Sequence, residues 1–139
     1  MIPVQRMLGD LREALELLGT VESEALSLAS VVVVDDDERL GELTARGLRR
    51  MGYDAHSTTQ VRALRSREIV VLDLGMTATM DTSTRAELKA SRPIVVTGAA
   101  DRASRLLAEE LGASDYLIKP VELEDLAAAI NRRMTEESR

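Results

Sequence analysis

The sequence contains no cysteine, no phenylalanine and no tryptophan, and tyrosine occurs only twice in 139 residues. Without cysteine the chain can form neither a disulfide framework nor a thiolate metal site. The scarcity of aromatic rings argues against the stacking platforms that bind single-stranded nucleic acid. No apolar run reaches the length of a membrane-spanning helix, and acidic residues interrupt the N-terminal apolar stretch, which is unlike a signal peptide. We therefore expect a cytoplasmic protein that has no membrane partner.

Basic residues are also few relative to acidic ones. The chain has 18 lysines and arginines and 24 aspartates and glutamates, which gives a net charge of −6. An acidic protein repels the negatively charged phosphate backbone of DNA and RNA, so we expect no nucleic-acid partner. The hydrophobic residues make up 45% of the chain and are mainly aliphatic. This length and composition suit a single α/β domain with an aliphatic core.

Residues 1–29 differ from the rest of the chain. Apolar residues recur there at intervals of seven in two series: Val4, Leu11, Leu18 and Ala25, and Met7, Ala14, Val21 and Leu28. This spacing predicts helices over residues 4–18 and 21–28, separated at Gly19. We expect a helical extension that pairs with another helix, either in a homodimer through residues 1–28 or with a partner protein, because the remainder of the chain looks complete without it. Packing of this extension on its own domain is the alternative.

From residue 30 to residue 139, strand and helix patterns alternate as in a single domain. Short apolar runs predict strands over residues 31–34, 55–58, 69–72, 93–97 and 116–118. Helical spacing predicts a first helix marked by Leu40, Leu43, Leu48 and Met51, and later helices over residues 61–67, 82–90, 102–111 and 123–134. This alternation predicts a parallel sheet that is covered by helices on both faces.

Polar side chains follow four of these strands: Asp35 and Asp36, then Asp73, Thr97 and Lys119. Parallel strands bring their carboxyl ends to one edge of the sheet, where ligands bind in open α/β folds. The carboxylates repel one another, and Mg²⁺ bound by oxygen ligands would relieve that repulsion. Asp73 is a candidate nucleophile for phosphoryl transfer, with Lys119 and Thr97 placed to hold phosphoryl oxygens.

Four short motifs carry a resemblance to a known family. They are Val-Val-Val-Asp-Asp-Asp at 32–37, Val-Val-Leu-Asp-Leu at 70–74, Ile-Val-Val-Thr-Gly at 94–98 and Asp-Tyr-Leu-Ile-Lys-Pro at 115–120. In this order, at successive strand ends, they resemble the receiver domains of two-component response regulators. The resemblance implies a flavodoxin-like fold, a doubly wound parallel sheet of five strands in the order 2-1-3-4-5.

The resemblance also implies roles at the site. Asp73 matches the phosphoacceptor, and Asp35 and Asp36 match the acidic pair that binds Mg²⁺, with Asp37 as the alternative register. The backbone carbonyl of Gly75 matches a further metal ligand.

The switch of the family has matching residues as well. Thr97 matches the hydroxyl that moves toward the phosphoryl group, and Tyr116 matches the aromatic residue that turns inward with it. Lys119 matches the lysine of the site, and its peptide bond to Pro120 is expected to be cis, as in relatives. The chain departs from the family at Thr77 and Asp81, where relatives usually have proline and glycine.

The function expected from this pattern is that of a stand-alone receiver. It would take a phosphoryl group from a histidine kinase or phosphotransfer protein and signal through a downstream protein partner, without being a turnover enzyme. One alternative is an interaction module that works without phosphorylation. Another is a haloacid dehalogenase-like phosphatase with Asp35 as nucleophile and Asp37 as acid, which leaves Asp73 unexplained.

Overall fold

The computed structural model describes residues 30–61 and 68–137. Five strands form one parallel sheet in the order β2-β1-β3-β4-β5, as predicted. Their bounds are β1 (Val31–Val34), β2 (Ala55–Thr58), β3 (Ile69–Asp73), β4 (Ile94–Thr97) and β5 (Asp115–Ile118). The three central strands are almost entirely apolar because both of their faces are covered. The flavodoxin-like fold class is therefore confirmed.

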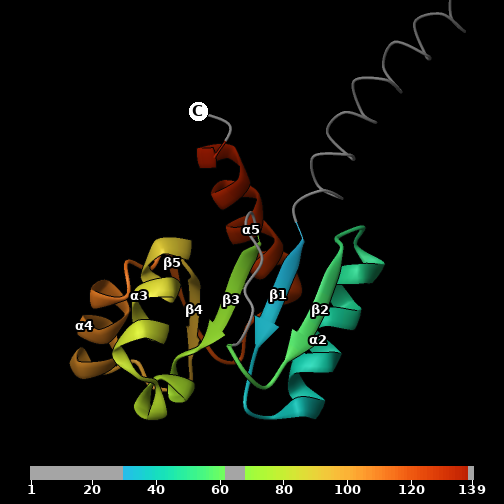
Figure 1. The fold of residues 1–139 in the computed structure, drawn as a ribbon. Helices are drawn as coiled ribbons and strands as arrows, with labels where there is room; N and C mark the ends of the chain where they lie inside the picture. The colour runs from blue at the N-terminus through green and yellow to red at the C-terminus, as the bar shows by residue number, and fades with distance from the viewer. Residues whose placement is uncertain (1–29, 62–67, 138–139) are drawn as a thin grey trace, which may run out of the picture.

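Helices cover both faces of the sheet (Figure 1). They are α2 (Glu38–Arg50), α3 (Thr82–Ser91), α4 (Arg102–Glu110) and α5 (Leu123–Glu137). One core layer joins the sheet to α2 and α5 through residues such as Leu48 and Ile130, neither of which has exposed surface. The other layer joins it to α3 and α4 through residues such as Leu88 and Ala108. The site at the strand ends therefore stands on a sheet that is packed from both sides.

Helix α2 begins directly beside the acidic strand end. Asp37 is its N-cap and accepts hydrogen bonds from the backbone N–H groups of Arg39 and Leu40, both at 3.1 Å. The leucine spacing predicted the helix but not the face that it buries, which consists of Gly41, Ala45 and Leu48. Leu40, Leu43 and Met51, by contrast, are 48%, 52% and 45% exposed.

The segment after Asp73, which departs from the family pattern, is a short 3₁₀-helix, η1 (Leu74–Thr79). The sequence predicted only a loop here. Asp73 caps this helix by accepting the N–H of Gly75 at 3.2 Å. Thr77, at the position where relatives have proline, is 1% exposed and donates its hydroxyl to the carbonyl of Leu74 at 2.8 Å. The side chain of Arg85 on α3 donates to the Thr77 carbonyl at 3.0 Å, which ties the two segments together.

Two of the predicted segments lie outside the described residues: the helical extension over 1–29 and the helix over 61–67. The peptide bond between Lys119 and Pro120 is cis, as expected. Among the helices described, none is both long enough and apolar enough to cross a bilayer.

Candidate functional site

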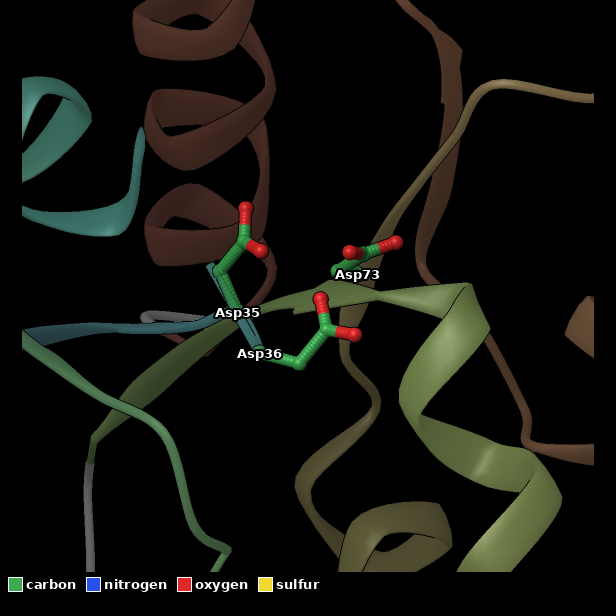
Figure 2. A group of neighbouring side chains, drawn as sticks. All are labelled: Asp35, Asp36 and Asp73. Atoms are coloured by element: carbon green, nitrogen blue, oxygen red, sulfur yellow. The ribbon is translucent and has the colours of Figure 1, made fainter. Parts of the chain in front are cut away.

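Three carboxylates meet at the carboxyl edge of the sheet (Figure 2). Val34 of β1 is paired with Leu72 of β3, so the residues that follow them, Asp35 and Asp73, lie at the same level on neighbouring strands. Asp36 extends the group. One ligand atom from each of the three side chains lies within 4.8 Å of the others. The structure thus brings together the three acids that the sequence assigned to one site.

Lys119, the residue directly after β5, lies beside these carboxylates. Its ammonium lies 3.5 Å from an oxygen of Asp73 and 3.8 Å from an oxygen of Asp35. The backbone holds the strand end in place, because the N–H of Lys119 donates to the carbonyl of Thr97 at 2.8 Å. One positive charge therefore offsets part of the negative charge of the carboxylates.

The environment of Asp35 differs from that of a surface carboxylate. Burial raises the pKa of Asp35 above its ordinary value of 3.8, and the nearby Asp73 carboxylate raises it further. The backbone N–H of Asp37, which donates to Asp35 at 2.9 Å, and the ammonium of Lys119 oppose the rise in this pKa. Burial and the neighbouring carboxylate therefore both oppose the charged form of Asp35, and a bound cation would stabilise that form.

The residues present fit a hard divalent cation. Mg²⁺ takes oxygen ligands at about 2.1 Å, so two ligands on opposite sides of it are roughly 4.2 Å apart. The spacing within the cluster, at most 4.8 Å, needs only a small adjustment, and the exposed side chain of Asp36 is free to make it. Asp37 is not part of the cluster, because its carboxylate caps α2. The geometry therefore favours Asp36 over the alternative register.

Thr97 and Tyr116 meet at one backbone carbonyl. The hydroxyl of Thr97, a residue that is 4% exposed, donates to the carbonyl of Ala99 at 3.3 Å and accepts the N–H of Ala99 at 3.1 Å. The phenol of Tyr116 donates to the same carbonyl at 3.0 Å. Neither the motif nor its spacing indicated this shared acceptor, which became visible only in the folded chain.

His56, the single histidine of the sequence, lies on the edge strand β2. Its side chain is 47% exposed, and its Nε2 lies 3.7 Å from a carboxylate oxygen of Glu68. It does not belong to the group of acids at the carboxyl edge.

Comparison with known proteins agrees with this geometry. The family described as "Response regulator receiver domain" matches residues 31–131. The sensory transduction protein RegX3 of Mycobacterium tuberculosis is 33% identical over 113 residues, which cover 74% of this chain and 49% of RegX3. The DNA-binding response regulator MtrA of Mycolicibacterium smegmatis is 33% identical over 114 residues, which cover 75% of this chain and 50% of MtrA.

A solved structure shows the same fold. It is a response regulator from Burkholderia pseudomallei with a phosphorylated aspartic acid, a calcium ion and citrate. It is 25% identical, and the match covers 79% of this chain and 71% of that one with a TM-score of 0.62. The chain spans about half the length of the curated relatives it matches. Because the family match covers most of the chain and the fold agrees with it, the chain belongs to the receiver domains of response regulators.

Proposed function

We propose that Asp73 accepts a phosphoryl group from a histidine kinase or a phosphotransfer protein. An oxygen of Asp73 attacks phosphorus while the bond from phosphorus to the donor's imidazole nitrogen breaks, and that nitrogen keeps the electron pair. The observation that carries the proposal is the position of Asp73, which lies within the acid cluster and 3.5 Å from the ammonium of Lys119. The phosphorylated aspartic acid of the Burkholderia pseudomallei regulator is a precedent in a relative.

Asp35, Asp36, Asp73 and the backbone carbonyl of Gly75 would hold Mg²⁺ at this site. The ion, when bound, would neutralise charge that develops on the phosphoryl oxygens. Lys119 would hold another phosphoryl oxygen, because its ammonium already reaches the Asp73 carboxylate. These residues would position the reacting groups and neutralise their charge, which is how proteins promote phosphoryl transfer. In this proposal the chain accepts the phosphoryl group itself and is not a turnover enzyme.

The Ala99 carbonyl that Thr97 and Tyr116 share suggests how phosphorylation of Asp73 would change the protein surface. When the hydroxyl of Thr97 turns to the phosphoryl group, it releases the carbonyl of Ala99, which Tyr116 also holds. The face formed by α4, β5 and α5 would change as a result. Two of these elements carry exposed apolar side chains, Leu106 on α4 at 47% and Ile118 on β5 at 45%, which suit a downstream protein partner.

A different surface suits the phosphodonor protein. Leu40 and Leu43 are both about half exposed near the start of α2, a few residues from Asp36. Apolar side chains beside an acidic site suit contact with a protein better than with a small donor.

The name of MtrA assigns DNA binding to that longer protein, and the net charge of −6 is our reason for proposing no nucleic-acid contact for these 139 residues. The proposal places the chain in the cytoplasm, with the kinase.

Binding of beryllofluoride, which mimics a phosphoryl group on a carboxylate, tests this function. We expect Mg²⁺-dependent binding to the native protein and none to Asp73→Asn. Asp54→Asn, an exposed aspartate after α2, serves as the matched control and should bind like the native protein. Equal binding by native protein and Asp73→Asn would contradict the assignment. Absence of binding to the native protein would favour the alternative of an interaction module that needs no phosphoryl group.

A further inference from the structure

A cavity of about 480 Å³ lies between the sheet and the N-terminal turns of α2 and α5. Its floor is formed by valines of the three central strands, Val33, Val71 and Val96. Leu40 lines it while remaining 48% exposed, and therefore lies at its mouth. Asp35, Asp73 and Lys119 form its polar end. The cavity thus opens inward from the acid cluster and is apolar over most of its wall.

The composition of the chain explains why side chains do not fill this space. The opposite end of the same layer is closed by Leu48, Ile130 and the ring of Tyr53, whose hydroxyl donates to Asn131 at 2.8 Å. At the carboxyl end the lining contains no aromatic ring, and its apolar part consists of valine, leucine and proline side chains.

We propose that this cavity binds a small neutral molecule with an apolar body and one hydroxyl group. Its volume falls within the range of about 300–1,000 Å³ that is typical of ligand sites, and such sites are mostly apolar with a few polar groups at one end. Without a bound metal ion, two carboxylates and one ammonium at the polar end give a formal charge of −1, which accepts a hydroxyl donor and repels an organic anion. The cavity is therefore a site for an uncharged amphiphile.

The ligand site shares Asp35, Asp73 and Lys119 with the acid cluster, so occupancy of one affects the other. Any such effect is reciprocal, because linkage requires each ligand to change the affinity for the other by the same factor. Binding to the cavity itself needs neither metal nor phosphodonor. Its test is therefore independent of whether Asp73 is phosphorylated.

Fluorescence titration of the full chain with 2-(hydroxymethyl)naphthalene, carried out in EDTA so that no divalent cation occupies the acid cluster, tests the proposal. We expect saturable binding with one probe per chain, and binding of 2-naphthoate, the anion of the same shape, that is at least about tenfold weaker. Thr44→Phe places a ring in the cavity from α2 and should abolish binding, whereas the matched control Thr44→Val, which changes little volume, should retain it.

Circular dichroism establishes that each variant is folded. If Thr44→Phe does not fold, Val121→Phe fills the same space from the segment before α5 and replaces it in the test. Equal affinity of native protein and the filled variant would overturn the proposal. So would equal affinity for the alcohol and the carboxylate, or an absence of saturable binding up to the solubility limit of the alcohol.

Discussion

At the scale of single residues, Lys119 places a positive charge beside the acid cluster. Its ammonium lies within 4 Å of two of the carboxylates proposed to bind Mg²⁺, so it competes with a cation for the same negative charge. We predict that Lys119→Met raises the affinity for Mg²⁺ about tenfold, which corresponds to roughly 1.4 kcal/mol, as measured by isothermal titration calorimetry. Lys89→Met, which removes an exposed lysine on α3, should leave the affinity unchanged. Unchanged or weaker binding by Lys119→Met would show that the lysine does not oppose the metal.

Asp81 gives a second prediction for a single residue, on stability rather than function. It caps α3, and the N–H of Thr84, which donates to it at 2.7 Å, lowers the pKa of Asp81 below 3.8. A carboxyl whose pKa is lower in the folded chain stabilises that state above the unfolded value and loses this contribution as the pH falls through the folded value. Asp101, the N-cap of α4, has its pKa lowered in the same way by Ser104.

We therefore predict that Asp81→Asn, which keeps a capping oxygen but has no charge, is less stable than the native protein at about pH 7, and that this difference shrinks as the pH falls below the ordinary value of 3.8. Urea denaturation over this pH range measures the difference. Glu87→Gln, on the exposed side of the same helix, is the control. Its stability relative to the native protein should not change in this way as the pH falls. A stability difference between native protein and Asp81→Asn that persists in acid would mean that the charge of the cap is unimportant.

At the level of elements, the two glycines of α2 differ in the space that a side chain would have. A Cβ at Gly47 would lie 2.6 Å from Cδ1 of Leu123 on α5, whereas a Cβ at Gly41 meets its nearest atoms at 3.4 Å. Alanine is better than glycine in a helix by about 1 kcal/mol. We predict that Gly41→Ala raises the free energy of unfolding by up to about 1 kcal/mol, while Gly47→Ala lowers it by about the same amount. Urea denaturation measures both changes.

A double substitution separates the two effects at Gly47. When Leu123→Ala has removed the contact, adding Gly47→Ala should increase stability relative to Leu123→Ala alone. If it does not, the close approach of α2 to α5 is not what requires glycine at this position.

Helix α2 also shows which structural features the sequence pattern could predict and which it could not. The strands were predictable because both faces of a central strand are buried, which leaves uninterrupted runs such as Val31–Val34. The helical spacing of Leu40 and Leu43 predicted α2, but both leucines remain exposed. The face against the sheet consists of Gly41, Ala45 and Leu48 instead. Likewise η1 was not predicted, because its stability comes from contacts of Thr77 and Arg85 that are formed only after folding.

For the whole molecule, parallel topology explains why the site could be predicted in outline. Asp35, Asp73 and Lys119 follow three different strands, and a parallel sheet places all of these ends at one edge. The bond partners of Thr97 and Tyr116 and the cavity beneath the acids were not predictable. They depend on how closely helices and loops approach the sheet, which no local pattern specifies.

Association of two chains is the remaining prediction at this scale. The two apolar series between residues 4 and 28 repeat every seven residues, which is the spacing of a helix that pairs with another helix. We predict that the native protein is a dimer by sedimentation equilibrium and that a variant with Leu11→Lys and Leu18→Lys is a monomer, because a buried lysine opposes pairing. Glu13→Lys, outside both series, should remain a dimer. The monomeric variant should still bind beryllofluoride, because the acid cluster lies entirely within residues 30–139. A variant that keeps the native mass would show that these residues do not join two copies, and would favour their packing on the receiver domain instead.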